Sequence, residues 1–277
     1  MNFDLIVIGS GPGGYVAAIR AAQLGMKTAV IERSELGGVC LNWGCIPTKA
    51  LLKSAQVYEY LLHAQDYGIK ATGVEADFGA MVKRSRGVAD AMSKGVQFLI
   101  NKNKVEVIAG NGKVKPGKKV EVTAADGSVT TYEAKHIVLA TGARSRELPN
   151  LKQDGKKVIG YREAMVLADQ PKSLVVVGSG AIGVEFAYFY NSIGTKVTIV
   201  EYLPNIVPLE DEDVSKQLAR SFKKSGIEIM TDSSVESVDT SGAGCKVKVK
   251  TKTGETRSGD IVFYVYYRAE NGESSGT

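Results

Sequence analysis

One pattern occurs twice in this chain and constrains its fold more than any other feature. It consists of a short apolar run, a Gly-x-Gly-x-x-Gly turn, a helical stretch and a second apolar run that ends in glutamate. The glycine turn and the acid span Gly9 to Glu32 in the first copy and Gly178 to Glu201 in the second. Apolar runs on both sides of such a turn are typical of buried parallel strands joined by a helix. The sequence therefore predicts an α/β fold with two Rossmann-like dinucleotide-binding units, each with a small antiparallel β element.

The glycines of the pattern have different uses. In the first copy, Gly9 permits a tight turn, Gly11 lets the backbone approach a pyrophosphate, and Gly14 allows close helix packing. The N–H groups and the dipole at the start of the following helix attract phosphate, and Glu32 accepts hydrogen bonds from a ribose. The second copy has the corresponding residues Gly178, Gly180, Gly183 and Glu201. Because the copies lie far apart in the chain, we expect two separate dinucleotide sites rather than a solenoid.

Two cysteines with four residues between them follow the first copy, in the stretch Gly37–Lys49. A lone close-spaced pair in a chain with only three cysteines is more often catalytic or metal-binding than part of a disulfide scaffold. A closed zinc site needs four ligands, but the chain has no second cysteine pair, and His63 and His136 lie outside any such spacing. We therefore interpret Cys40 and Cys45 as a redox pair and expect no bound metal.

The position of Cys45 suits a reactive thiol. Pro47 is compatible with a first helical turn, so we expect a helix over residues 46–62 that begins next to Cys45. A helix N-terminus lowers the pKa of a thiol, and Lys49 adds positive charge one turn further on. The third cysteine, Cys245, has no partner motif, and we interpret it as a bystander in a hairpin.

Between the motifs the sequence gives weaker signals. Residues 75–103 have the spacing of a long amphipathic helix. Short apolar runs at residues 105–108 and 120–122, with glycine turns nearby, predict a small antiparallel sheet. We also expect the glycine turns to open helices that run from Tyr15 to Leu24 and up to Ile193.

Composition excludes several other classes of protein. The 277 residues are 44% hydrophobic and 23% charged, which is typical of a soluble globular protein with enough chain for two cores. The net charge of +5 is small and spread along the chain, so we expect no nucleic-acid partner and a solvated hairpin at Lys113–Lys119. We find no apolar segment of membrane-spanning length, and Met1 leads almost directly into the first strand. The expected location is the cytoplasm, or the mitochondrial matrix if a presequence was removed.

Four segments in a fixed order carry a family resemblance. They are GSGPGG from residue 9, GGVCLNWGCIPTK from residue 37, ATGARSRELP over residues 140–149 and GSGAIGVEFA over residues 178–187. Their order resembles the pyridine nucleotide-disulfide oxidoreductases, and within that family most closely the dihydrolipoamide dehydrogenases. The resemblance covers residues 1 to about 262. It implies an FAD-binding domain over residues 1–148, an NAD-binding domain over residues 149–263 and a divergent polar tail over residues 264–277.

The resemblance also implies which residues hold the cofactors. For FAD these are Gly9, Gly11, Gly14, Glu32, Gly38, Lys49, Gly112, Thr141 and Gly142. For NAD they are Gly178, Gly180, Gly183, Glu201 and Val235. Glu201 favours NAD over NADP, because a carboxylate binds a free ribose 2′-hydroxyl and repels a 2′-phosphate. A glutathione-reductase-like enzyme is therefore the less favoured alternative, and the lack of an extra cysteine pair disfavours a mercuric-reductase-like one.

Four residues receive catalytic roles from the same resemblance. Cys40 is the exchange thiol that meets dihydrolipoamide, and Cys45 is the thiol that lies against the flavin. Lys49 approaches the flavin and pairs with Glu185, which by spacing alone is an ordinary polar residue of its helix. The implied reaction converts dihydrolipoamide and NAD⁺ to lipoamide and NADH, with electrons passing through the disulfide and FAD. The implied partner is the lipoyl domain of a 2-oxo acid dehydrogenase or glycine-cleavage complex.

The end of the sequence departs from the family pattern. The family continues with a second FAD segment that contains a Gly-Asp pair and with a C-terminal dimerisation domain that contains a His-x-x-x-x-Glu pair. Here Gly259-Asp260 precedes an apolar strand where the family's pair follows one, and neither histidine has the glutamate. Residues 271–277 have the composition of a disordered tail. For the 277 residues alone we expect weak FAD binding and very low lipoamide turnover, with a non-catalytic dinucleotide-binding fragment as the alternative.

Overall fold

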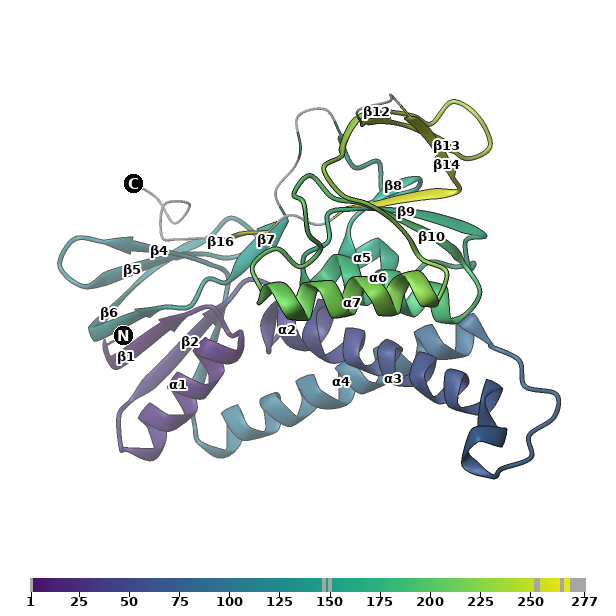
Figure 1. Ribbon diagram of the computed structural model, residues 1–277. Coiled ribbons are helices and arrows are strands. Elements are labelled where there is room, and N and C mark those ends of the chain that lie inside the picture. Colours follow the sequence, from purple (N-terminus) through teal and green to yellow (C-terminus); the bar gives the residue numbers. More distant parts are fainter. Residues whose placement is uncertain (1, 146–147, 149–150, 252–254, 265–266, 270–277) are drawn as a thin grey trace. The chain divides into compact units, whose positions relative to one another are not determined.

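The computed structural model describes residues 2–145, 148, 151–251, 255–264 and 267–269. These residues form two compact units (Figure 1). The first unit takes the described parts of Met1–Pro47, Arg86–Arg144 and Arg268–Thr277, and the second takes those of Thr48–Ser85 and Ser145–Tyr267. Both units combine helices with sheets, in agreement with the predicted α/β class. The units divide the chain at other points than the expected domains, and the division into an FAD and an NAD domain stays a prediction.

A six-stranded sheet forms the centre of the first unit, in the order β3-β2-β1-β6-β5-β4. The strands are β1 (Asn2–Ile8), β2 (Thr28–Glu32), β3 (Glu106–Ala109), β4 (Asn111–Lys115), β5 (Lys119–Thr123) and β6 (Val129–Leu139). Strands β3, β2, β1 and β6 pair in parallel, whereas β6, β5 and β4 pair antiparallel. The eleven-residue β6 belongs to both parts, because it pairs with β1 on one side and β5 on the other.

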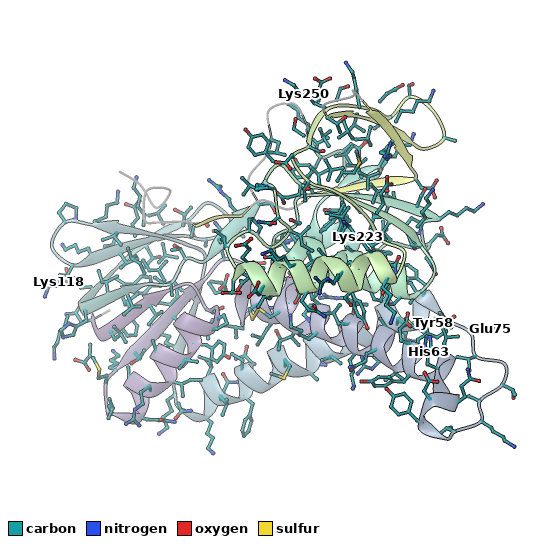
Figure 2. The ribbon with its side chains drawn as sticks, in the orientation of Figure 1. Tyr58, His63, Glu75, Lys118, Lys223 and Lys250 are labelled. Carbon is teal, nitrogen blue, oxygen red and sulfur yellow. A yellow bond between two sulfur atoms is a disulfide. The ribbon has the colours of Figure 1, made fainter. Side chains whose placement is uncertain are left out.

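The prediction of a small antiparallel sheet from residues 105–108 and 120–122 was wrong in one respect. Strand β3 pairs in parallel with β2, so it extends the parallel part of the sheet. The expected antiparallel pairing is present in β4, β5 and β6, and Lys118 lies in the turn between β4 and β5 (Figure 2). The physical reason is that β3 follows the long helix α4 (Phe78–Lys102), and a helical crossover returns the chain parallel to the preceding strand.

The helix after β1 and the second half of α4 pack against this sheet. Helix α1 (Pro12–Gln23) begins three residues earlier than expected, because Pro12 suits the first helical position after Gly11. Helix α2 (Gly38–Trp43) and helix α3 (Cys45–Leu62) follow β2, and a short 3-10 helix η1 (Ala64–Tyr67) lies after them. Apolar residues of α1 and the second half of α4 pack with β1 and β2 in one core: Leu5, Val7, Ala18, Ala21, Val30, Val96 and Ile100.

In the second unit a five-stranded parallel sheet lies between helices and a smaller sheet. Its order is β11-β10-β9-β15-β8. The strands are β8 (Val158–Ile159), β9 (Ser173–Val177), β10 (Lys196–Val200), β11 (Glu228–Met230) and β15 (Ile261–Tyr264). The smaller antiparallel sheet comprises β12 (Ser234–Asp239), β13 (Cys245–Lys250) and β14 (Glu255–Gly259). Two further strands, β7 (Ala143–Ser145) and β16 (Tyr267–Ala269), pair with each other, and most of their residues belong to the first unit.

Both faces of the parallel sheet are covered. Helices α5 (Tyr161–Ala164), α6 (Ala181–Ser192) and α7 (Glu212–Lys224) lie on one side of it, and β12–β14 lie on the other (Figure 1). On the helix side, the ring of Phe186 in α6 lies 4.8 Å from that of Phe263 in β15. On the other side, Val175 and Val177 of β9 share a core with Val247 of β13. Coverage on both faces explains why β9 and β10 read as continuous apolar runs.

Candidate dinucleotide and disulfide sites

The two glycine turns have matching backbone conformations. Gly9 has φ 96° and Gly178 has φ 95°, values in the left-handed region that favours glycine. A Cβ on Gly14 would lie 1.9 Å from the carbonyl oxygen of Gly9, and a Cβ on Gly183 would lie 2.2 Å from that of Gly178. In both units the helix therefore approaches the end of the strand so closely that only glycine fits, as the repeated sequence pattern predicts.

The middle glycine of each turn faces open space. Gly11 and Gly180 are the N-cap residues of α1 and α6, and none of the described side chains caps either helix. A Cβ on Gly11 or on Gly180 would meet no described atom within 4 Å. The N–H groups at the start of both helices thus have room for an anionic group beside them. The turns fit the pyrophosphate of a dinucleotide, which needs a close approach to the backbone at this glycine.

Each glutamate at the end of the second strand is tied to the glycine turn of its own unit. The Glu32 carboxylate accepts hydrogen bonds from the N–H and hydroxyl of Ser10, and its second oxygen accepts one from the N–H of Ser34 at 2.9 Å. Glu201 accepts from the N–H and hydroxyl of Ser179 at 2.7 and 2.6 Å and from the N–H of Leu203 at 2.9 Å. Hydrogen bonds to the serine of the turn therefore hold each carboxylate beside a glycine turn.

The two serines were not among the predicted site residues. Ser10 and Ser179 are the second residue of each Gly-Ser-Gly turn, so the repeat itself contained the signal. The two acids differ in exposure, since Glu201 is 6% exposed and Glu32 is half-buried. The second carboxylate therefore depends more strongly on its hydrogen bonds, because a buried charge without partners is costly.

Other predicted FAD residues lie near the first glycine turn. A Cβ on Gly38 would lie 2.9 Å from Cα of Gly11, so the start of α2 touches this turn. Thr141 and Gly142 follow β6, and a Cβ on Gly9 would lie 3.3 Å from Cα of Thr141. Gly112 in β4 contacts the sheet instead, because a Cβ there would lie 3.2 Å from the Ile8 side chain.

Val235, the remaining predicted NAD residue, is 9% exposed and packs in the core of the second unit. The cofactor roles of all these residues stay predictions.

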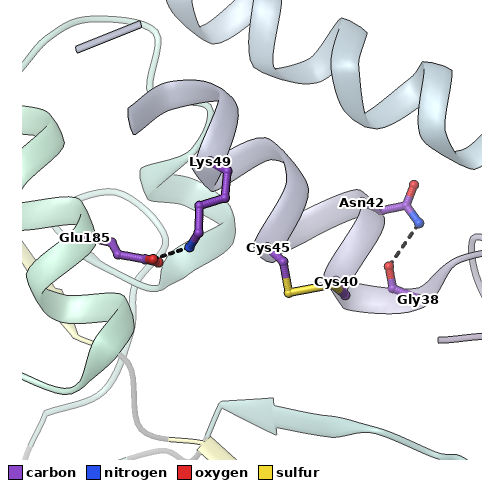
Figure 3. Close-up of a disulfide and its surroundings, with 6 residues drawn as sticks. All are labelled: Gly38, Cys40, Asn42, Cys45, Lys49 and Glu185. Atoms are coloured by element: carbon purple, nitrogen blue, oxygen red, sulfur yellow. Dashed lines mark hydrogen bonds and ion pairs between the residues drawn. A yellow bond between two sulfur atoms is a disulfide. The ribbon is translucent and has the colours of Figure 1, made fainter. Parts of the chain in front are cut away.

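Cys40 and Cys45 form a disulfide, as the resemblance implied (Figure 3). Their Cα atoms are 4.7 Å apart, within the range of ordinary disulfides. Cys40 lies in α2 and Cys45 is the first residue of α3, with Gly44 as the C-cap of α2 between them. Helix α3 therefore begins one residue earlier than expected, and a sulfur of the disulfide stands at its N-terminus.

The second unit contains the predicted pair of Lys49 and Glu185. The Lys49 ammonium forms an ion pair with Glu185 Oε1, although the two residues are 136 positions apart (Figure 3). Lys49 lies one turn along α3 from Cys45, and Glu185 lies in α6, the helix that follows the second glycine turn. The side chains are 62% and 24% exposed. The structure brings the two residues together, while their catalytic role stays a prediction.

Two residues near the end of the chain have structural contacts. The Asp260 carboxylate accepts from the N–H groups of Lys172 at 2.8 Å and Ser173 at 3.1 Å, so it anchors the start of β9. Cys245 begins β13 in a hairpin, as expected, and is 2% exposed. Burial raises the pKa of its thiol.

The part of the chain that the structure describes contains no cluster of three or more His, Cys, Asp or Glu suited to a metal ion. None of its described helices has the length and apolar character to span a membrane.

Comparisons with known proteins agree with this geometry. The family model described as pyridine nucleotide-disulphide oxidoreductase matches residues 3–272. A dihydrolipoyl dehydrogenase from Zymomonas mobilis is 48% identical over 254 residues, which cover 92% of this chain and 54% of the relative. A dihydrolipoyl dehydrogenase from Chlorobaculum tepidum is 50% identical over 248 residues, which cover 90% of this chain and 53% of the relative. The crystal structure of LpdA from Mycobacterium tuberculosis has a TM-score of 0.86 at 31% identity, covering 94% of this chain and 57% of that one. The chain spans about half the length of the curated relatives it matches.

Proposed function

Because the chain belongs to the pyridine nucleotide-disulphide oxidoreductase family, we propose that it is the FAD- and NAD-binding part of a dihydrolipoyl dehydrogenase. The observation that carries this proposal is the Cys40–Cys45 disulfide, which joins the two helices that follow the first dinucleotide unit. The names of the relatives support the substrate, since two of them are dihydrolipoyl dehydrogenases at 48% and 50% identity. The matching acid-bound glycine turns support two dinucleotides per chain.

FAD would bind at the first glycine turn and NAD at the second. The residues proposed for FAD are Gly9, Gly11, Gly14, Glu32, Gly38, Lys49, Gly112, Thr141 and Gly142. Those proposed for NAD are Gly178, Gly180, Gly183, Glu201 and Val235. When bound, FAD supplies two-electron transfer between the thiols and the nicotinamide. The protein contributes orientation through the glycine turns and fixed acceptors through Glu32 and Glu201.

The chain's own chemistry is thiol–disulfide exchange at Cys40 and Cys45. A dihydrolipoamide thiolate attacks the Cys40 sulfur, which breaks the Cys40–Cys45 bond and releases Cys45 as a thiolate at the start of α3. The helix N-terminus favours this negative charge. The second substrate thiol then attacks the mixed disulfide and releases Cys40. One disulfide has opened, lipoamide has closed as another, and two electrons have passed to the cysteine pair.

Lys49 and Glu185 are proposed to act as one charged pair. Lys49 stands four residues after Cys45 on the same helix, and its ammonium is held by Glu185. An ion pair restricts the long lysine side chain, which would otherwise sample many rotamers. We propose that this fixed positive charge lies beside the flavin of the loaded enzyme, as the family resemblance implies.

An anaerobic titration of the 277-residue chain with dithionite tests the proposed function. We expect a flavin absorbance band, and after two electrons a long-wavelength band from a thiolate beside the flavin. Cys45→Ser should abolish the long-wavelength band and keep the flavin band. Loss of neither band in Cys45→Ser would contradict the assignment, and a colourless chain that also fails to take up added FAD would favour the non-catalytic fragment.

Three finer expectations belong to the same proposal. The partner would be the lipoyl domain of a 2-oxo acid dehydrogenase or glycine-cleavage complex, and the complete enzyme would be a homodimer. Very low lipoamide turnover by residues 1–277 alone stays a prediction, which an assay of NADH formation checks. The cytoplasmic or mitochondrial compartment also stays a prediction, which cell fractionation checks.

A further inference from the structure

Asn42 lies between the two cysteines and is buried, with 7% of its surface exposed. Its amide nitrogen donates to the carbonyl oxygen of Leu36 at 2.9 Å and to that of Gly38 at 3.0 Å (Figure 3). Leu36 precedes α2 and Gly38 is its first residue. The Asn42 side chain therefore links the C-terminal turn of α2 to Leu36 before the helix and to the first residue of the helix.

Ser93 of α4 is distant from Asn42 in the sequence but lies within hydrogen-bond distance of the Asn42 side-chain amide. Its hydroxyl lies 2.7 Å from Oδ1 of Asn42 and 2.8 Å from the carbonyl oxygen of Leu36. A hydroxyl has one proton, so it donates to one of these two acceptors at a time. With both amide atoms of Asn42 engaged, α2 is fastened to α4, which packs in the core of the first unit.

A second contact between α4 and α2 lies two turns earlier on α4. Arg86 donates to the backbone carbonyl oxygen of Asn42 at 2.6 Å, and its guanidinium lies 4.2 Å from the ring centroid of Trp43. That distance is within the range of a cation–π contact. At the N-cap of α2, the N–H of Gly37 donates to the carbonyl oxygen of Ser10 in the glycine turn at 3.1 Å. The segment that carries Cys40 is thus held by α4 through Leu36 and Asn42 and by the glycine turn through Gly37.

We propose that Asn42 and Ser93 are positioning residues that keep Cys40 near Cys45 after the disulfide has opened. This inference rests on the proposed function, because it concerns how the same disulfide is used. In the dithiol form no covalent bond joins the sulfurs, so only the backbone decides how far apart they move. A held backbone gives the two thiols a high effective concentration for each other and favours closing of the disulfide. A loosened α2 lets Cys40 move away and favours the dithiol.

The equilibrium with dithiothreitol measures this effect and needs no flavin. Two electrons and two protons pass from the reagent's thiols to Cys40 and Cys45, so the protein disulfide opens as a cyclic reagent disulfide forms. The 277-residue chain is equilibrated anaerobically at a series of reagent ratios, quenched with acid and alkylated. Trypsin then releases Ser34–Lys49, which contains both cysteines, separately from Cys245. Mass spectrometry gives the fraction of this peptide with two alkyl groups.

The variants are Asn42→Ala, Ser93→Ala and the double mutant. The first control is Ser93→Thr, which keeps the hydroxyl. The second is Ser85→Ala, because Ser85 is a buried serine of α4 whose hydroxyl donates to the Val82 carbonyl oxygen of the same helix at 2.8 Å. We expect each single variant to lower the equilibrium constant for closing by about tenfold, or about 30 mV, as for the loss of one or two hydrogen bonds. The free-energy change in the double mutant should be smaller than the sum of the two single changes, since both substitutions break the same hydrogen-bond network. The two controls should stay within about twofold of the parent.

Three results would overturn the inference in different ways. If Asn42→Ala and Ser93→Ala keep the parent's helix content by circular dichroism and also keep its equilibrium constant, the two residues do not position Cys40. If Ser85→Ala shifts the constant as much as Ser93→Ala does, the effect is general destabilisation of α4. If the parent's disulfide stays closed at every reagent ratio, the proposed function fails as well. Ser93→Ala removes a single hydroxyl, so it keeps the test decisive if Asn42→Ala does not fold.

Discussion

Ser179 and Glu201 are 22 residues apart in the sequence, and two hydrogen bonds join them inside the second unit. The N–H of Ser179 donates to Glu201 Oε2 at 2.7 Å and its hydroxyl donates to the same oxygen at 2.6 Å. Ser10 and Glu32 form the same pair in the first unit, again 22 residues apart. The acid that the sequence assigns to ribose binding is therefore also a structural part of the glycine turn.

Glu201→Ala should weaken both the second unit and its affinity for NADH. The change leaves the Ser179 and Leu203 N–H groups without their acceptor, and we expect a loss of about 1–3 kcal/mol in the free energy of unfolding. NADH should bind at least about tenfold more weakly, since a ribose hydroxyl loses a charged acceptor. Fluorescence titration with NADH and urea unfolding measure the two effects. Glu210→Ala, at an exposed residue of the following loop, is the control. Unchanged NADH affinity in Glu201→Ala would show that the acid has only a structural role.

Gly13 and Gly14 are neighbours in α1 with opposite expected sensitivity. A Cβ on Gly14 would lie 1.9 Å from the Gly9 carbonyl oxygen, whereas one on Gly13 would meet no described atom within 4 Å. Gly14→Ala should therefore distort the turn and abolish FAD uptake. Gly13→Ala should keep FAD uptake and add about 0.5–1 kcal/mol of stability, as expected for alanine in a helix. The ratio of flavin to protein absorbance after incubation with FAD measures uptake, and equal uptake by the two variants would refute the proposed place of the pyrophosphate.

The Lys49–Glu185 pair should contribute little to stability. Because Lys49 is 62% exposed, a double-mutant cycle with Lys49→Met and Glu185→Gln should give a coupling energy of about 0–1 kcal/mol in urea unfolding. If the chain binds FAD, both single variants should nevertheless change the long-wavelength absorbance band, because each removes one charge from the proposed pair. Lys53→Met, at another lysine of α3, is the control for the helix. A band that is identical in all variants would remove Lys49 and Glu185 from the proposed site.

Cys245 should make stability fall at high pH. Burial raises the pKa of its thiol above the ordinary value of 9.0, with Lys157 acting in the opposite direction. Above about pH 9 the unfolded chain loses this proton before the folded chain does, so the free energy of unfolding decreases as pH rises. Urea unfolding at pH 8 and pH 10 should therefore show a steeper loss for the parent than for Cys245→Ala. Equal slopes for the two proteins would contradict the raised pKa.

The sequence predicted correctly those features that depend on a short local pattern of residues. The turn at Gly9, the close approach at Gly14 and the acid at Glu32 follow from strand–turn–helix geometry, and the structure contains all three. Helix ends shifted by only a few residues, as at α1 and α3, because Pro12 and Pro47 are both compatible with a first turn. Strand β3 could not be assigned to the parallel sheet, because pairing direction depends on the partner strand and not on the strand's own residues.

Hydrogen bonds around the disulfide join residues that are distant in the sequence, and no local pattern predicted them. Asn42 reads as one polar residue between two cysteines, and Ser93 reads as one serine in a long amphipathic helix. Their hydrogen bond joins positions 51 residues apart, and only the packing of α4 beside α2 brings them together. Glu185 is similar, because its partner Lys49 was predicted from a family resemblance and not from spacing.

By itself the sequence determined two Rossmann-like units and a pair of cysteines, since these depend on backbone geometry that glycine, proline and apolar residues impose locally. The tertiary structure decided which side chains meet across the chain: Ser179 with Glu201, Lys49 with Glu185, and Asn42 with Ser93. The physical reason is the range of the forces involved. A turn is set by the few residues in it, whereas a hydrogen bond between distant residues forms only after the core has fixed the elements that carry them.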